Sequence, residues 1–424
     1  MIRDRVRLPL AGAAFRFAAC AAALLVLSCG ASDRGSAELW TDVPELALAV
    51  ELFNASQPKH IVQIAWKADL SEAVKEAAKP PTLAIGRYLK SQGVRDRFQS
   101  LDYLFGELVV NQSAFYPGLL SLGMLEGRQL LLPVSFNLPA VIFPRGENRV
   151  AGDFMITLED MAAPAAAYNQ KDKRGFTRMG FSPRWDGDFL TLAIDSAGAG
   201  FKEGKPLAWS DAGLASALGE VRAWVSRTNG SAAAEDEFQF KYLYTPAYQY
   251  VASGRTLFAY LDSSRLFQIP EEKRANLDYR WFAQGEKIRV SDDIVYAAIL
   301  RSSGGKQAAE AFLSWFFRED SQKAILESAR KTRALESGFG LAEGFSAIRS
   351  VNERVFPLFY PALVGHIPPA DSLYAPNILP NDWARLKSDT VAPWLIEATA
   401  SPTPDPGGEL SSFIAENAKK TSKP

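Results

Sequence analysis

The sequence predicts a mixed α/β protein of two or three folding units. The chain has 424 residues, more than one compact core usually holds. Strand patterns at residues 37–41, 60–66 and 81–85 alternate with helical patterns, and this alternation predicts a parallel sheet with right-handed crossovers. Hydrophobic residues make up 47% of the chain and charged residues 22%, which is the usual composition of a soluble globular protein.

The two helices of this opening stretch have separate signals. Leu46, Val50 and Phe53 fall at i, i+4 and i+7, which places them on one helical face. Asp42 can cap this helix at its start. Residues 71–79 carry the second helical pattern, between the second and third strands. The order of elements is therefore strand, helix, strand, helix, strand.

The later chain continues the α/β pattern and then changes character. Helical spacing dominates residues 156–227, strands are predicted at 256–261 and 293–300, and two helices are predicted within 306–329. Seven prolines lie within 357–393. Because proline disrupts helix interiors, this region is predicted to be an irregular segment that wraps across the preceding domains.

The first residues predict a secretory signal rather than part of the fold. A basic leader with Arg3, Arg5, Arg7 and Arg16 precedes an apolar run at 17–27. Small residues follow this run, as at a cleavage site. The apolar run is about half the ~20 residues that a spanning helix needs. Residues 1–28 are therefore expected to be a signal peptide, with a retained N-terminal anchor as the alternative.

The end of the leader resembles the lipobox of bacterial lipoproteins. The sequence Val26-Leu27-Ser28-Cys29 is similar to that motif, with Val26 where leucine is commonest and Leu27 where a small residue is usual. The resemblance implies that the Cys29 thiol is acylated, that the chain is cut before it, and that the mature protein is anchored to a bacterial membrane outside the cytoplasm. Residues 29–36 are small and polar and are expected to be a flexible tether.

Charge and cysteine content exclude several classes of function. Without residues 1–28 the chain has 43 basic and 47 acidic residues, a net charge of about −4, and no basic cluster of the kind that nucleic-acid binding needs. Cys20 lies in the leader, so the mature chain can form no internal disulfide. His60 and His366 are the only histidines, and no motif for a metal or another cofactor is present. No cofactor and no nucleic-acid partner are expected.

Four stretches together resemble the extracellular solute-binding proteins of ABC transporters, in the group that includes sugar-binding members. They are residues 38–42, 132–139, 254–260 and 308–317. The resemblance implies two α/β lobes in a Venus-flytrap arrangement, with a small solute, a sugar by family precedent, held between them. It also implies a permease and its ATPase as partners, a monomeric state and no enzymatic activity.

The resemblance also sets expected domain boundaries. The first lobe is predicted to comprise 37–143 and, after the chain returns, 256–330. The second lobe is predicted at 144–255 and the wrapping segment at 331–400. Residues 401–424 are expected to be a tail with a short final helix.

Candidate ligand contacts in the first lobe lie at strand ends, where open α/β sheets bind ligands. Trp40 and Asp42 end the first strand, and Asp42 is either a helix cap or a ligand contact. Arg87 follows the third strand and is either a contact or a surface residue. Ser135 and Asn137 lie where the chain leaves the first lobe. Asn137 offers both a donor and an acceptor, with a turn residue as its alternative role.

Three further candidates lie in later segments. Trp185, in the loop 182–187 before a helix, is the expected stacking platform for a sugar face. Asp262 follows a predicted strand and faces the cleft or caps a helix. Trp281 ends another strand and either stacks on ligand or belongs to the core.

Two other classes of function remain open at this stage. A secreted glycoside hydrolase needs two carboxylates beside the scissile bond, and the chain has many acidic residues. A surface adhesin needs an exposed patch rather than a closed cleft.

Overall fold

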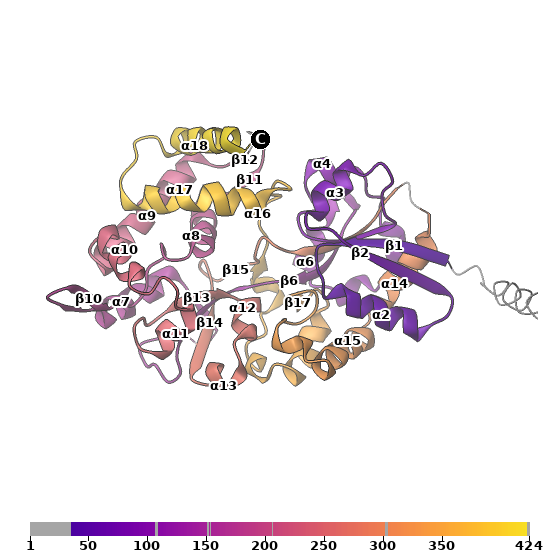
Figure 1. Ribbon diagram of the computed structural model, residues 1–424, viewed down its shortest axis with the longest axis horizontal. Coiled ribbons are helices and arrows are strands. Elements are labelled where there is room, and N and C mark those ends of the chain that lie inside the picture. The colour runs from indigo at the N-terminus through magenta and orange to yellow at the C-terminus, as the bar shows by residue number, and fades with distance from the viewer. Residues whose placement is uncertain are drawn as a thin grey trace, which may run out of the picture.

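A computed structural model describes residues 35–106, 109–150, 152, 154–205, 207–301 and 304–421. Two lobes lie side by side, each built on its own sheet (Figure 1). The predicted signal peptide, Cys29 and most of the tether lie outside the described residues. Gly35 and Ser36, which were expected in the tether, begin the first strand.

The first lobe contains a six-stranded sheet in the order β17-β6-β16-β3-β1-β2. Its strands are β1 (Gly35–Thr41), β2 (His60–Trp66), β3 (Leu83–Gly86), β6 (Leu132–Phe136), β16 (Val295–Ile299) and β17 (Phe345–Ser346). The first three are parallel, as predicted, and β16 joins β3 in the antiparallel sense. The chain therefore leaves this sheet after β6 and returns to it twice.

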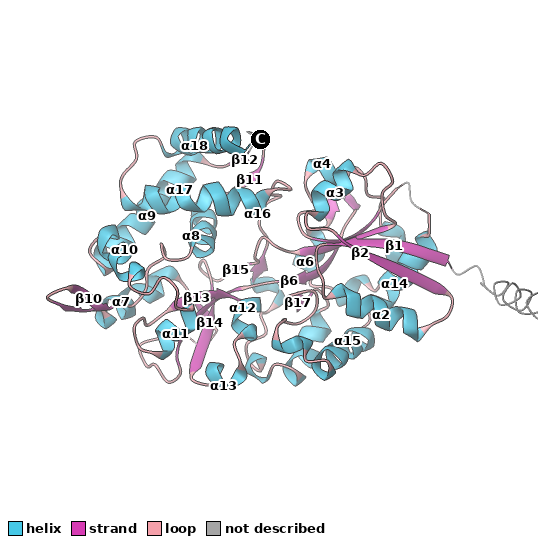
Figure 2. Ribbon diagram, in the orientation of Figure 1, coloured by secondary structure: helices cyan, strands magenta, loops and turns pink. Residues whose placement is uncertain are grey.

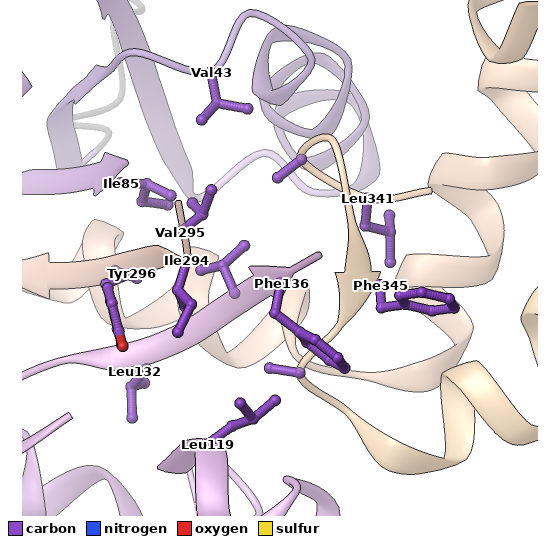
Figure 3. Packing of buried hydrophobic residues seen from close by; sticks show 14 of the residues in the cluster. Val43, Ile85, Leu119, Leu132, Phe136, Ile294, Val295, Tyr296, Leu341 and Phe345 are labelled. Carbon is purple, nitrogen blue, oxygen red and sulfur yellow. The ribbon is translucent and has the colours of Figure 1, made fainter. Parts of the chain in front are cut away.

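Helices cover this sheet because each has one apolar face. They are α2 (Leu46–Ser56), α3 (Leu70–Glu76), α4 (Gln92–Arg95), α5 (Asp102–Gly106), α6 (Pro117–Ser121), α14 (Lys306–Phe316) and α15 (Glu319–Lys331). The Phe53 ring of α2 lies 5.3 Å from that of Phe312 on α14. Full burial of such a side chain contributes roughly 1.5–3 kcal/mol. Figure 3 shows part of this core, where Phe136 and Phe345 pack beside each other.

The second lobe contains a four-stranded sheet in the order β13-β7-β14-β8. Its strands are β7 (Pro139–Pro144), β8 (Met155–Ile156), β13 (Ala259–Asp262) and β14 (Leu277–Phe282). The surrounding helices are α7 (Leu158–Tyr168), α8 (Gly187–Ile194), α9 (Asp211–Thr228), α10 (Ala232–Phe240), α11 (Ala247–Ala252), α12 (Ser263–Gln268) and α13 (Glu271–Arg274). Figure 2 shows that helices dominate this lobe.

Both faces of the four-stranded sheet are buried. Phe143, Tyr260 and Phe282 belong to a core cluster with α8 and α9. Tyr279 and Trp281 belong instead to the cluster that also fills the first lobe. The Tyr279 hydroxyl donates to the Ala362 carbonyl at 3.0 Å. One apolar core therefore runs beneath both sheets and joins the lobes at their base.

The C-terminal part wraps across both lobes, as predicted. Residues 345–346 add β17 to the first sheet. The chain then crosses to the second lobe, where α16 (Trp383–Leu386), α17 (Ala392–Ala400) and α18 (Pro406–Thr421) follow. Helix α17 packs on α8 and α9, and α18 packs on α9 (Figure 1, yellow). Much of the predicted tail is therefore a docked helix.

The lobe boundaries differ from those expected from the sequence. Residues 139–144 were placed at the end of the first lobe but form the strand β7 in the second sheet. Residues 259–262 and 277–282 were placed in the returning part of the first lobe, yet both segments pair with β7. The return comes only at β16. An apolar strand pattern does not say which sheet it joins, because long-range packing decides the partner.

Three chain crossings connect the lobes and are tied to one another. The first follows β6 at Asn137, the second carries β15 (Ile288–Arg289), and the third carries β18 (Leu373–Tyr374). Strands β15 and β18 pair in parallel. The Ser291 amide donates to the Asn137 carbonyl at 3.0 Å. These bonds make the crossings a single hinge unit.

Candidate functional site

A cavity of about 110 Å³ lies between the lobes, above the hinge crossings. We call it the interlobe cavity. It is lined by Tyr88, Asp188, Thr191, Leu192, Tyr260, Asp262, Arg265, Arg289, Ser291, Asp292, Asp293, Trp383 and Lys387. Both lobes, the second crossing and the C-terminal segment all contribute to its walls. Its volume is below the ~300 Å³ of most ligand pockets, so it holds only a small group in this conformation.

Tyr88 is the contribution of the first lobe to this cavity. It follows β3 and packs against the core cluster of the second lobe. Its φ of 56° is left-handed, a conformation that costs a non-glycine residue of order 1–3 kcal/mol and that is often found at functional sites. Burial raises the pKa of Tyr88 well above its usual value, and Asp292 and Asp293 add to this effect. The phenol is therefore neutral and available as a hydrogen-bond donor.

A charged network forms another part of the cavity wall. The Lys387 ammonium lies 2.9 Å from the Asp188 carboxylate and 3.3 Å from that of Asp292. Burial alone would lower the pKa of Lys387, but these two carboxylates outweigh it and raise the pKa. The Trp383 indole N–H also donates to Asp292. Both Asp292 and Lys387 are thus engaged by neighbours.

Two arginines of the cavity are likewise paired. The Arg289 guanidinium donates to Asp195 at 2.5 Å. Arg265 donates to Asp262 at 2.6 Å and lies 3.7 Å from Asp186. Asp262 also caps α12 by accepting from the Arg265 amide at 2.8 Å. The cations that line the interlobe cavity are therefore held by carboxylates of the protein itself.

Asp293 and Ser291 differ from these groups because each has an uncommitted oxygen. Asp293 Oδ1 and Ser291 Oγ are buried and have no hydrogen-bond partner within the described part of the chain. Burial raises the pKa of Asp293 to about 6; Arg87 opposes the rise, and Asp292 and Asp262 add to it. Buried polar atoms are nearly always paired in folded proteins. These two atoms are therefore the best candidates for ligand contacts.

Among the predicted site residues, Asp262 lines the interlobe cavity. Arg87 and Asp42 are not among the residues that line it. The Arg87 amide donates to both carboxylate oxygens of Asp42 at 3.3 Å, and its side chain donates to Glu343. The N-cap position of α2 is Glu45, so Asp42 does not cap this helix. Gly86 permits the arrangement, because a Cβ there would lie 2.2 Å from Asp42. These residues brace the loop that carries Tyr88.

Ser135 and Asn137 hold the hinge together, and their side chains are occupied. The Ser135 hydroxyl donates to the Ala342 carbonyl at 2.7 Å. The Asn137 amide donates to the Glu343 carbonyl at 2.9 Å, and its oxygen accepts from Ser263 at 2.7 Å. Asn137 also lies 3.4 Å from Asp293. Both residues are buried. Through its contact with the Asp293 carboxylate, Asn137 helps to position that group.

The three predicted tryptophans lie in different places. Trp281 is fully buried, and its indole N–H donates to the His366 carbonyl at 2.8 Å, so it is a core residue. Trp40 donates to Glu38 at 2.7 Å and lies under Lys67, and it does not line the interlobe cavity. Trp185 lines a separate cavity in the second lobe. Ligand contact by Trp185 and Asp262 stays a prediction.

Sequence reasoning missed most of the residues that line the interlobe cavity. Asp292 and Asp293 lie at the start of the strand predicted at 293–300, and this adjacent pair of acidic residues was the available signal. Tyr88 stands next to Arg87, which had been singled out. Trp383 and Lys387 lie in the Pro-rich segment, where no periodic pattern indicates which side chains face inward. Tertiary folding alone brings them to the cavity.

Solved structures with this architecture cover nearly the whole chain. A cyclic alpha-maltosyl-1,6-maltose binding protein from Arthrobacter globiformis aligns with a TM-score of 0.60 and 17% identity, over 91% of this chain and 98% of that one. An ABC substrate-binding protein from Listeria monocytogenes in complex with cycloalternan gives 0.58 and 13%, over 92% and 100%. An extracellular solute-binding protein of family 1 from Alicyclobacillus acidocaldarius gives 0.60 and 13%, over 92% and 99%.

The chain has the fold of the extracellular solute-binding proteins. At these identities the likeness concerns the fold, which confirms the two-lobe α/β prediction. No known protein-family model and no curated protein matches the sequence. Within the described ranges, no helix is long and apolar enough to span a bilayer, and no group of three or more His, Cys, Asp or Glu side chains is placed to hold a metal ion.

Proposed function

We propose that the chain is the extracytoplasmic, lipid-anchored solute-binding component of an ABC importer, and that its solute is a carbohydrate. The observation that carries the proposal is the interlobe cavity with its uncommitted acceptors, Asp293 Oδ1 and Ser291 Oγ. Hydroxyl groups of a sugar can donate to both atoms, and the charge-assisted bond to a carboxylate is the stronger kind.

The charge arrangement favours a neutral polyhydroxylated solute over an anion. The lining cations Arg265, Arg289 and Lys387 already have carboxylate partners. An anionic solute would have to displace one of these partners while lying near the free oxygen of Asp293. A neutral sugar needs no such exchange. The similar proteins described above as binding oligosaccharides support the same class of solute.

Transport follows from the placement of the cavity between two lobes. Lobes that close over a solute couple occupancy to shape, and a permease can then discriminate the loaded protein from the empty one. Retention at the membrane would come from the acyl group expected on Cys29. The permease, its ATPase and the anchor are parts of the proposal that rest on the sequence resemblance.

A thermal-shift screen tests solute binding directly. The mature chain without its lipidated cysteine, residues 30–424, is incubated with monosaccharides, oligosaccharides, polyols, sugar phosphates and amino acids. A binding solute at a hundredfold excess over its Kd stabilises the fold by ~2.7 kcal/mol. We expect neutral sugars to raise Tm and sugar phosphates to have no effect. A shift only with amino acids or phosphates would contradict the carbohydrate assignment, and release of reducing ends from oligosaccharides would indicate a hydrolase instead.

The anchor needs a separate test on the full-length chain. Expression in a bacterium followed by membrane fractionation is expected to leave the protein in the membrane pellet, with an acylated N-terminal cysteine in the mass spectrum. The Cys29→Ser variant is expected to move to the soluble extracytoplasmic fraction. An unmodified Cys29 in a soluble wild-type protein would contradict the anchor and leave solute binding unaffected.

A further inference from the structure

A second cavity, of about 210 Å³, lies within the second lobe. We call it the aromatic cavity. Its walls include Trp185, Phe238, Tyr242, Tyr250 and Tyr260. It is nearly twice the volume of the interlobe cavity, and its walls come from the second lobe alone. The proposed function assigns no role to it.

The two cavities are neighbours separated by a thin partition. Tyr260 lines both of them. Arg265 lines the interlobe cavity, Asp186 lines the aromatic cavity, and their charged groups lie 3.7 Å apart. The two cavities are therefore adjacent, and the Tyr260 ring and the Arg265–Asp186 pair form the boundary between them. Together the two volumes reach the lower end of the ~300–1,000 Å³ range of ligand pockets.

The aromatic walls are held rigidly in place. The Trp185 ring stacks on Phe238 with centroids 5.5 Å apart and planes inclined by 21°. Its indole N–H donates to the Glu235 carbonyl at 3.3 Å. The Tyr250 hydroxyl donates to the Tyr242 carbonyl, and the rings of these tyrosines lie 5.6 Å apart. Trp185, Tyr242 and Tyr250 line the cavity, and rings fixed in this way can contact the C–H face of a sugar at little cost in conformational entropy.

One polar atom in this cavity has no partner. Thr256 is 1% exposed, lines the cavity, and its hydroxyl makes no hydrogen bond within the described residues. A buried hydroxyl without a partner is unfavourable, and a solute that supplies a donor or an acceptor removes that cost. The unpartnered Thr256 hydroxyl is independent of the aromatic walls, and it indicates a polar rather than a purely apolar occupant.

Exposed apolar side chains lie next to this cavity along the chain. Leu243 lines it and is 56% exposed, and the neighbouring Tyr244 is 95% exposed. Both belong to the connection between α10 and α11. Surface tyrosines with fully free rings are suited to stacking on a ligand that extends out of a pocket.

We propose that the aromatic cavity binds a second sugar ring, so that the solute is an oligosaccharide with one ring in each cavity. This inference rests on the proposed carbohydrate function and deepens it. The Trp185 and Tyr250 walls provide stacking surfaces and Thr256 provides the polar contact. The chain of the oligosaccharide passes Tyr260, and Leu243 and Tyr244 cover any further ring.

The first test measures affinity against chain length by calorimetry on the mature protein. The probes are glucose, maltose and maltotriose, and mannose, mannobiose and mannotriose. In the series that binds, we expect the disaccharide to bind at least about tenfold more tightly than the monosaccharide, because it adds a stacked ring and a hydrogen bond. Equal affinity across chain lengths would overturn the inference and leave the carbohydrate function intact, whereas failure of every probe would contradict both.

The second test compares two isosteric variants. Thr256→Val removes the unpartnered hydroxyl from the aromatic cavity. Thr228→Val is its matched control, because the Thr228 hydroxyl is also buried without a partner in the described chain and lines neither cavity. We expect Thr256→Val to weaken disaccharide binding about five- to tenfold and monosaccharide binding by less than twofold. Thr228→Val should change neither affinity, and identical behaviour of the two variants would overturn the assignment.

A third variant and a further probe identify the occupant. Ala247 lines the aromatic cavity at the start of α11, and Ala247→Phe should fill the space and reduce disaccharide affinity to that of the monosaccharide. Circular dichroism checks that this variant folds.

Phenyl glucoside carries an apolar ring in place of the second sugar. If it binds as tightly as the disaccharide and ignores Thr256→Val, the cavity holds an apolar group and the sugar assignment is wrong.

Discussion

The interlobe cavity and the aromatic cavity adjoin at Tyr260, yet their walls are built on different principles. The interlobe cavity is lined by polar and charged side chains from both lobes, such as Tyr88 from the first lobe and the Lys387–Asp188 pair from the second. The aromatic cavity is lined by rings from a single lobe, such as Trp185 against Phe238. The first can therefore change when the lobes move, whereas the second keeps its shape through any hinge motion.

Because the aromatic cavity is formed within one lobe, we expect it to depend on the stability of that lobe. Behind Trp185, the Arg184 guanidinium pairs with Glu235 at 3.3 Å, and both side chains are almost inaccessible to solvent. Arg184→Ala leaves Glu235 buried without its cation, which typically costs ~3–5 kcal/mol of unfolding free energy. Urea denaturation of the mature protein should show this loss.

The exposed pair Arg227–Glu159, at 2.8 Å, provides the control for this variant. Arg227→Ala should cost less than about 1 kcal/mol, because solvent already screens that pair. If the two variants are equally stable, the buried Arg184–Glu235 pair does not stabilise the lobe that forms the aromatic cavity.

The next largest effect concerns the interlobe cavity. Asp293→Asn keeps the shape of the side chain but removes its charge, so affinity for a bound sugar should fall about tenfold. At pH 7 the same variant should be more stable than the wild type, because an ionised carboxylate whose Oδ1 has no hydrogen-bond partner is no longer buried. Calorimetry and thermal melts measure the two effects. Asp371→Asn, at an exposed position, should change neither, and a loss of both affinity and stability would favour a purely structural role for Asp293.

Dependence on pH follows from the same carboxyl group. Because the pKa of Asp293 is raised from 3.8 to about 6, the folded protein holds a proton that the unfolded chain loses first. The contribution of Asp293 to stability is therefore present below about pH 4 and is lost as pH rises to about 6. Sugar affinity should change in the opposite direction and weaken as pH falls from 7 to 5, because sugar hydroxyls donate best to the ionised form. Calorimetry at intervals across this range should show both trends removed in Asp293→Asn.

The smallest predicted effect is at Tyr88, where the first lobe lines the interlobe cavity. Tyr88→Phe should weaken sugar binding by less than about tenfold, because it removes one hydroxyl. Tyr88→Gly removes the ring as well but relieves the left-handed backbone, whose φ is 56°. We expect Tyr88→Gly to bind more weakly than Tyr88→Phe without a comparable loss of Tm. A Tm loss in Tyr88→Gly above that of Tyr88→Phe would show that the ring serves packing rather than binding.

The elements were more predictable from sequence than their partners in space. The strand predicted at 60–66 matches β2, and the helical spacing found within 156–227 covers nearly all of α9, because hydrophobic periodicity is local. The strand predicted at 256–261 was placed in the wrong sheet, since β13 pairs with β7. Nothing in the sequence of this strand indicates which of the two sheets it joins.

The site shows the same limit. Asp262 was found because it follows a strand and precedes a helix, which is a local signal. Asn137 was predicted as a ligand contact, but it does not line the interlobe cavity, and its side-chain bonds to Glu343 and Ser263 depend on segments more than a hundred residues away. Whether a polar side chain is free or occupied is a property of the folded core and is not encoded in its neighbours.

Trp383 and Lys387 line the interlobe cavity but lie near the end of the sequence, and this has a consequence for biosynthesis. A ribosome-bound chain that has not yet extruded residue 387 lacks the ammonium that neutralises Asp188 and Asp292. Asp188 and Asp292 then lack their shared cation, and the part of the wall formed by Trp383 and Lys387 is missing. The interlobe cavity can therefore be completed only after nearly the whole polypeptide has been made.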